Sequence, residues 1–247
     1  MPPTDHFPRK PAVLVGSHLI EICTACTSLP CIHCGGLLKE TDHVFPHSLF
    51  RAIRDAQRDN VVRLLRDQSH DLNSLKDSHG YTPLSVATLI SDKQIALQIC
   101  ETLLDWGASP RIPTGIAGRT ALILMVWHRN FNFNVAELLN KSIDDQDENG
   151  RTALMFAAEG AGLFASRRGN LTIAKDLLKL GADLSIQDHG GLTALGHAMK
   201  SNDTGKNNDM IELLKNEMEK QAALREFRSR HRIGFDNHGI LNVTLIR

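Results

Sequence analysis

NGRTALMFAAEG at residues 149–160 and GNLTIAKDLLKLGAD at residues 169–183 decide the fold of this 247-residue chain. Gly150 can form a tight turn, and Thr152 is a good N-cap because its hydroxyl can accept a hydrogen bond from a free N–H of the first helical turn. Gly181 stands where a left-handed helix stop needs a residue without a side chain. Between these signals the sequence predicts two successive helices.

Both expected helices have one apolar face. In the first helix Leu154, Ala157 and Ala158 fall on one side, and the two alanines allow a second helix to pack closely. The second helix repeats apolar residues at helical spacing: Leu171, Ile173, Ala174, Leu177 and Leu178. One pair of this size cannot bury its own apolar face, so the stretch predicts neighbouring pairs of the same kind.

The same opening, Gly-x-Thr-[Pro/Ala]-Leu, occurs four times in the chain. It reads GYTPL at Gly80, GRTAL at Gly118, GRTAL at Gly150 and GLTAL at Gly191. Each opening leads to a Leu-Leu pair, at residues 103–104, 138–139, 177–178 and 213–214. The openings are about 30 to 40 residues apart, which is the period of a helical repeat array.

With these motifs, residues 47 to about 216 resemble the ankyrin-repeat family. Two units also carry its Gly-Ala ending, at Gly107 and Gly181. The resemblance implies an all-α fold, a solenoid of about five helix pairs preceded by a small Cys-rich N-terminal segment. The first pair, SLFRAIRDAQRDNVVRLLRD at residues 48–67, lacks the glycine-threonine opening, as terminal capping units often do.

The units depart from the family in one respect that bears on stability. The usual sequence motif of the family is Thr-Pro-Leu-His, and its histidine forms hydrogen bonds that connect neighbouring loops. The corresponding residues here are Ser85, Ile123, Met155 and Gly196. We therefore expect a divergent array without that network between repeats.

The expected domains are residues 1–46, a Cys-rich segment; residues 47–216, the repeat array; and residues 217–247, a capping helix with a strand-like tail. Ala12–Val15 is a short strand candidate. The last nine residues, 239–247, alternate like a strand. A lone strand with an apolar face needs an edge, so we expect this tail to return to the N-terminal segment or to pair with a partner.

The function that the resemblance implies is a non-enzymatic scaffold that binds a protein partner. In the family, recognition uses the loop tips just before each opening, together with the inner helices. Carried onto this chain, the partner-binding residues are Ser78, His79, Tyr81, Arg119, Glu148, Asn149, Arg151, His189 and Leu192. Tyrosine and arginine are residue types that often anchor interfaces. The acidic run DDQDENG at 144–150 is interpreted as a solvated loop.

Four of the five cysteines lie close together near the N-terminus. CTACTSLPCIHC places Cys23, Cys26, Cys31 and Cys34 in two Cys-x-x-Cys pairs. Two such pairs can supply the four thiolates of a tetrahedral zinc site, so we expect a zinc knuckle in a reducing compartment. The linker between the pairs is short, so His18, His33, His43 or His47 could replace a sulfur. The alternative is a set of small buried thiols that hold no metal.

The second cysteine pair begins another resemblance. CIHCGGLLKETDHVFPHS at residues 31–48 is similar to the opening of HNH-type nucleases. That similarity implies His43 as the residue that activates water and Asp42 as a ligand of the divalent ion. No second Cys-x-x-Cys and no closing histidine follow in the sequence, and Asn60 is the candidate for the middle asparagine. The alternative function is thus a zinc-dependent nuclease module targeted by the repeats.

Composition narrows the remaining classes. The chain has 28 basic and 28 acidic residues, a formal net charge of zero that favours neither nucleic acid nor an anionic membrane. No apolar run approaches the roughly 20 residues that span a bilayer. The start, MPPTDHFPRKPAVLVGS, is too proline-rich around a short apolar run to be a secretory signal. We expect a monomeric cytoplasmic protein; the alternative is a bacterial effector of the ankyrin type that acts in a host cell.

Overall fold

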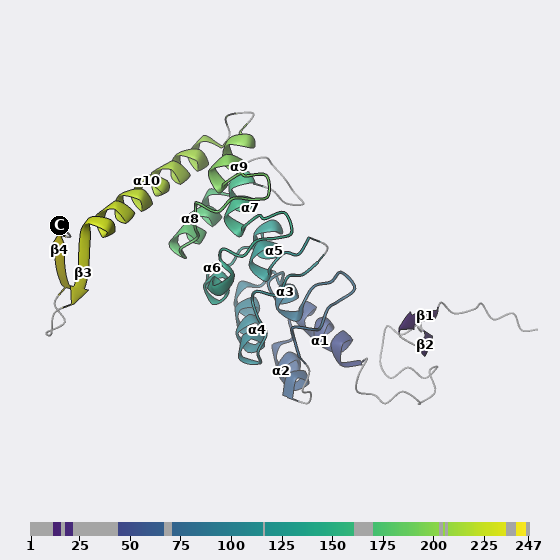
Figure 1. Cartoon of the computed structure of the whole chain (residues 1–247). Coiled ribbons are helices and arrows are strands. Elements are labelled where there is room, and N and C mark those ends of the chain that lie inside the picture. The colour runs from purple at the N-terminus through teal and green to yellow at the C-terminus, as the bar shows by residue number, and fades with distance from the viewer. Residues whose placement is uncertain are drawn as a thin grey trace, which may run out of the picture. The chain divides into compact units, whose positions relative to one another are not determined.

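The computed structural model divides the chain into two units (Figure 1). They are Met1–Asp42 and His43–Arg247, and each is described by itself. The residues that the structure describes are 12–15, 18–21, 44–66, 71–115, 117–160, 170–202, 205, 207–235 and 241–245.

In the first unit two short strands form a hairpin. Strand β1 (Ala12–Val15) pairs antiparallel with strand β2 (His18–Glu21), and Val15 lies opposite His18. The strand expected at Ala12–Val15 is confirmed.

In the second unit the described residues form five successive helix pairs. The pairs are α1 (Val44–Arg54) with α2 (Arg58–Arg66), α3 (Pro83–Ala87) with α4 (Lys93–Asp105), α5 (Ala121–Trp127) with α6 (Phe133–Leu138), α7 (Ala153–Glu159) with α8 (Leu171–Lys179), and α9 (Ala194–Lys200) with α10 (Asn208–Arg230). A 3₁₀ turn, η1 (Asn140–Ser142), follows α6. We call the first helix of each pair its inner helix. The inner helices form one row and pack on one another in the order α1, α3, α5, α7, α9 (Figure 1). The second helices form another row, in which α2 packs on α4 and α4 packs on α6.

The threonine of each glycine-threonine opening begins an inner helix. The hydroxyls of Thr82, Thr120, Thr152 and Thr193 each accept a hydrogen bond from the main-chain N–H three residues later, over 3.3 to 3.4 Å. Each bond satisfies a donor that the first helical turn leaves free, and such caps stabilise a helix by about 1 kcal/mol. The helix starts predicted from these threonines are therefore confirmed.

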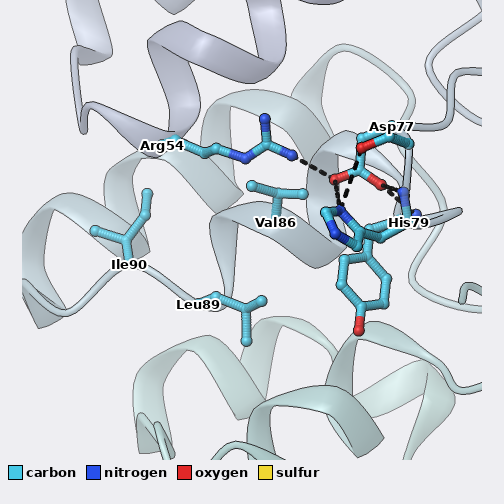
Figure 2. Close-up of a pocket in the computed structure, with 8 residues that line it drawn as sticks. Arg54, Asp77, His79, Val86, Leu89 and Ile90 are labelled. Atoms are coloured by element: carbon cyan, nitrogen blue, oxygen red, sulfur yellow. Dashed lines mark hydrogen bonds and ion pairs between the residues drawn. The ribbon is translucent and has the colours of Figure 1, made fainter.

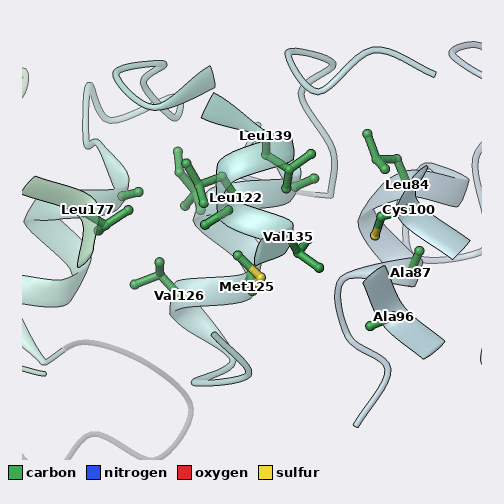
Figure 3. Close-up of a cluster of buried hydrophobic side chains, with 14 of the residues drawn as sticks. Leu84, Ala87, Ala96, Cys100, Leu122, Met125, Val126, Val135, Leu139 and Leu177 are labelled. Carbon is green, nitrogen blue, oxygen red and sulfur yellow. The ribbon is translucent and has the colours of Figure 1, made fainter. Parts of the chain in front are cut away.

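The core lies between the two rows of helices. Figure 3 shows part of it, with Leu84 and Ala87 of α3 facing Ala96 and Cys100 of α4. Cys100 is fully buried, and this burial, with the nearby Glu101 carboxylate, raises the pKa of its thiol to about 12. The thiol thus stays protonated and packs as a small apolar group.

The chain ends in a long helix followed by two strands, one of them in the tail where a strand was expected. Helix α10 runs without a break through Asn216, and strand β3 (His231–Phe235) follows it. Strand β4 (Leu241–Leu245) pairs antiparallel with β3, so the tail finds an edge in the strand just before it, which the sequence did not predict. Pairing with the strand just before it closes a short loop, which has the lowest entropic cost. Contact of the tail with the N-terminal segment or with a partner stays a prediction. The domain boundaries at 46/47 and 216/217 stay predictions.

Asparagine side chains nevertheless join neighbouring helix pairs, at positions other than those where the histidines were expected to be missing. Asn130 Nδ2 donates to the carbonyls of Thr88 and Ile90 over 2.9 Å in each case. Asn207 Nδ2 donates to the carbonyls of Ala158 and Ala198 over 3.0 and 3.1 Å. An asparagine amide offers two donors, so one side chain can hold two carbonyls and thereby join neighbouring helix pairs.

None of the helices within the described ranges combines the length and apolar character that crossing a bilayer requires.

Candidate protein-binding surface

Three of the loops that precede the inner helices share one turn built on an aspartate. The main-chain N–H groups of Asp77, Asp147 and Asp188 donate to the carbonyls of Tyr81, Arg151 and Leu192 over 2.9 to 3.0 Å. In each turn the aspartate Oδ1 also accepts two main-chain N–H groups, two and four residues later, over 2.8 to 2.9 Å. These aspartates stabilise the turns, because a short polar side chain can hydrogen-bond to main-chain groups a few residues later.

Sequence reasoning missed these aspartates, although each stands three residues before the opening glycine. Asp147 belongs to the acidic run that was interpreted as a solvated loop, yet it is only 5 % exposed. The interpretation was wrong for this residue because its carboxylate accepts hydrogen bonds from the main-chain N–H groups of Asn149 and Arg151 within the turn. The loop before α5 lacks an aspartate, and Thr114 pairs there with Arg119 through two main-chain hydrogen bonds of 2.8 and 3.0 Å.

Main-chain hydrogen bonds join each loop to the next. Gly115 N–H donates to the carbonyl of Gly80 over 2.9 Å, and Glu148 N–H donates to the carbonyl of Ala117 over 3.1 Å. His189 N–H donates to the carbonyl of Asn149 over 3.0 Å. The loop tips are thereby held side by side. We call their described residues the tip surface: 78–81, 115, 117–119, 148–151 and 189–192.

Gly150 tests this joining of the loops. Its φ of +77° is left-handed, and an added Cβ would lie 2.8 Å from the main-chain nitrogen of His189 in the next loop. Gly181 has a similar φ of +94°, but an added Cβ would meet nothing within 4 Å. We expect Gly150→Ala to lower the free energy of unfolding by about 1–3 kcal/mol more than Gly181→Ala, because only the first forces a neighbouring loop to move. Urea denaturation of both variants measures the difference, and equal losses would show that the loops are not in close contact there.

The predicted partner-binding residues fall into two groups. Ser78, His79, Glu148, Asn149 and His189 have exposed side chains. Tyr81, Arg119, Arg151 and Leu192 are half-buried. The structure brings all nine together on the tip surface, and their contact with a partner stays a prediction.

The two half-buried arginines stack on aromatic rings of the inner helices. The guanidinium carbon of Arg119 lies 4.0 Å from the centre of the Trp127 ring, and that of Arg151 lies 3.8 Å from the centre of the Phe156 ring. The Trp127 and Phe156 rings themselves meet edge to face at 5.5 Å. Cation–π contacts of this kind contribute roughly 0.5 to 2 kcal/mol each. Both arginines therefore stabilise the array, a role that spacing alone does not reveal.

An ion-pair chain continues from Arg151. Its guanidinium lies 3.2 Å from Glu159, whose carboxylate lies 3.6 Å from Nδ1 of His197. Nε2 of His197 lies 2.8 Å from Asp188. Glu159 and then Asp188 raise the pKa of His197, against the opposing effect of burial. His197 lowers the pKa of Glu159, and Arg151 adds to that shift.

Two hollows flank the half-buried Tyr81. The first, of about 360 Å³, is lined by Arg54, Asp77, Ser78, His79, Tyr81, Val86, Leu89 and Ile90. Figure 2 shows the ion pair between Arg54 and Asp77, with the apolar side chains of Val86, Leu89 and Ile90 nearby. The second, of about 640 Å³, is lined by Ser78, His79, Gly80, Tyr81, Thr114, Gly115, Ala117, Arg119 and Leu124. Sequence reasoning did not identify Arg54, Leu89 or Leu124, which become neighbours only through packing.

The cysteine and nuclease predictions lie elsewhere. Cys23, Cys26, Cys31, Cys34, Asp42 and His43 are outside the described residues, so the zinc knuckle and the nuclease module stay predictions. In the part of the chain that the structure describes, no group of three or more His, Cys, Asp or Glu side chains is placed to hold a metal ion.

One comparison with known proteins bears on this surface. Residues 149–189 match the family model of the ankyrin repeat. No curated protein matches the chain. The matched range includes α7, α8 and the loop tips at both ends of that pair. The match supports an ankyrin-repeat protein, and α7 with α8 is the helix pair that the family model matches.

Proposed function

We propose that this chain is a non-enzymatic protein-binding module that holds its partner on the tip surface and the exposed parts of the inner helices. Ankyrin repeats are typically interaction domains without catalysis, and one helix pair matches that family. The other four pairs would be divergent repeats, since three of them share the threonine cap and the glycine opening. The main support for the proposal is that main-chain hydrogen bonds hold neighbouring loops side by side, with two hollows beside Tyr81.

The joined loops favour binding because their order already exists in the free protein. Main-chain hydrogen bonds connect neighbouring tips, and aspartates hold three of the turns. A partner that binds to such loops does not have to order them, so less binding free energy is lost. Exposed tips such as Ser78, Asn149 and His189 then meet the partner without rearrangement.

Tyr81 is the proposed anchor. Tyr81 lines both hollows, and its ring stacks on that of His79 with ring centres 6.1 Å apart. A half-buried tyrosine that lines two hollows can lose its remaining water contact when a partner covers it. Residues with these properties often contribute most to interface affinity.

The test compares two double variants. The tip variant is His79→Ala/Tyr81→Ala. The control, called the outer variant, is Glu137→Ala/Thr172→Ala, which changes exposed side chains of α6 and α8. Proteins crosslinked to the wild-type chain are identified, and the dissociation constant of the purified partner is measured for each variant. We expect the tip variant to bind at least about tenfold more weakly and the outer variant to bind normally. Arg151 is unsuitable for this test because it stacks on Phe156 and pairs with Glu159.

Circular dichroism controls for folding in both variants. Unchanged affinity in a folded tip variant would place the partner on another face. Equal losses in both variants would indicate a general effect on the array. A cytoplasmic or host-cell location and the monomeric state remain predictions.

A further inference from the structure

The second hollow contains a guanidinium with no carboxylate in contact. Arg119 lines the hollow together with Tyr81, Thr114 and Leu124. Among the described residues, Arg54, Arg111 and Arg151 each have a carboxylate within 4 Å from another part of the chain, at 2.5, 3.8 and 3.2 Å. No such ion pair is present for Arg119 within the described ranges. Burial lowers the pKa of Arg119, and the more distant Asp147 only partly offsets that effect.

The position of this guanidinium is nevertheless well defined. Its carbon lies 4.0 Å from the centre of the Trp127 ring and 5.4 Å from that of Phe156. Its main chain pairs with that of Thr114 in both directions. The terminal nitrogens of Arg119 make no hydrogen bond within the described part of the chain, so the described residues leave the planar fork that suits a carboxylate unoccupied.

A second observation in the same hollow points to a missing partner. Thr114 also lines it, and this residue is only 1 % exposed. Its Oγ1 and the Nε of Arg119 are both buried without a hydrogen-bond partner among the described residues. Buried polar atoms in folded proteins are nearly always paired, so two unpaired atoms in one wall need an explanation.

The nearest acidic side chains do not supply that partner. Asp147 is buried, and its Oδ1 accepts two main-chain N–H groups of its own turn. Its Oδ2 is buried without a hydrogen-bond partner among the described residues, so this oxygen does not bond to Arg119 either. Glu148 is exposed beside Gly118, and neither carboxylate comes within 4 Å of the Arg119 guanidinium in the described residues. No described residue therefore occupies the fork.

We propose that the hollow between the loops at 77–81 and 114–119 binds an aspartate or glutamate side chain of the protein partner, with the carboxylate on Arg119 and neighbouring apolar atoms on Tyr81 and Leu124. The proposal rests on the proposed function and names the chemistry that the partner must present. A nucleic acid is disfavoured because a phosphate backbone needs a row of cations, whereas this hollow offers one. One bidentate guanidinium suits one carboxylate.

The probe is acetyl-Leu-Glu-Leu-amide, compared with acetyl-Leu-Gln-Leu-amide, which has the same shape without the charge. Both are titrated into the full chain while the Nε–Hε signal of Arg119 is followed by NMR. We expect a saturable shift with the glutamate peptide and at least about tenfold weaker binding of the glutamine peptide. Arg119→Gln removes both the charge and the fork, and we expect it to lose the preference for glutamate.

Arg111→Gln is the matched control, because Arg111 is exposed and already paired with Asp145. It should leave the glutamate preference unchanged. Equal binding of both peptides, or a preference that survives in folded Arg119→Gln, would overturn the carboxylate site. If partner binding still depends on His79 and Tyr81 in that case, the proposed function stands and only this assignment fails.

Discussion

Replacing Phe156 with alanine is expected to lower the free energy of unfolding by about 3–5 kcal/mol. Phe156 is fully buried in α7. Its ring contacts the edge or face of Trp127 and lies under the guanidinium groups of Arg119 and Arg151. The alanine variant leaves a cavity and removes the surface on which Arg151 stacks. Urea denaturation followed by far-UV circular dichroism measures the loss.

Two further variants separate the contributions at this position. Phe156→Leu keeps most of the apolar volume but removes the aromatic ring, so we expect a smaller loss of about 1–2 kcal/mol. Phe133→Ala, at a half-buried phenylalanine of α6, is the matched control and should cost less than Phe156→Ala. If Phe156→Ala and Phe133→Ala lower the free energy of unfolding by the same amount, the Phe156 ring is not the centre of the packing between loops and inner helices.

The second large effect concerns His197 and pH. His197 is 4 % exposed and lies between Glu159 and Asp188, which raise its pKa above the ordinary value of 6.5. A histidine with a raised folded-state pKa contributes its full stabilisation below 6.5, and loses it as pH rises through the raised value. We expect His197→Gln to cost about 3 kcal/mol near pH 6, the low end for breaking a buried pair, because Glu159 keeps contact with solvent.

The carboxylates give the opposite dependence at lower pH. His197 and Arg151 lower the pKa of Glu159 from its ordinary 4.5, against burial. For Asp188, burial raises the pKa, but hydrogen bonds from Leu192, His197 and Gly190 outweigh it, and the net shift is downward from 3.8. Their stabilisation is present above the ordinary values and is lost as pH falls. This cluster therefore contributes most between about pH 4.5 and 6.5.

The measurement is the free energy of unfolding from pH 4 to 9 for the wild type, His197→Gln and His189→Gln. His189 is exposed on the neighbouring loop and serves as the control. We expect the decline above pH 6.5 to shrink in His197→Gln and to persist in His189→Gln. A decline of the same size in all three proteins would assign it to other groups.

Helix starts could be predicted because they depend on contacts within a few residues. Thr152 caps α7 whatever its distant neighbours are, and the four threonines repeat the same local geometry. The aspartate turns follow the same logic, and their spacing before Gly80, Gly150 and Gly191 was present in the sequence but not recognised. The strand at 241–245 was expected, whereas its pairing with β3 was not, because a strand pattern does not identify its neighbour.

The candidate surface was predictable in position and not in chemistry. The repeated openings place Tyr81, Arg119, Arg151 and Leu192 at equivalent loop positions, and the structure places all four on the tip surface. Their different environments depend on side chains about 5 to 40 residues away in the sequence. Arg151 stacks on Phe156 and pairs with Glu159, whereas Arg119 stacks on Trp127 and has no carboxylate in contact among the described residues.

By itself, the sequence determined the helix pairs, their caps and their turns, since these come from hydrogen bonds and apolar spacing within short segments. Only the tertiary structure decided which loops touch, which arginine is already paired and where the hollows lie. The physical reason is that each of these features needs two or more helix pairs to stack in register. Gly150 shows it most simply: its local turn requires glycine for its φ, but the contact with His189 exists only when the next loop lies against it.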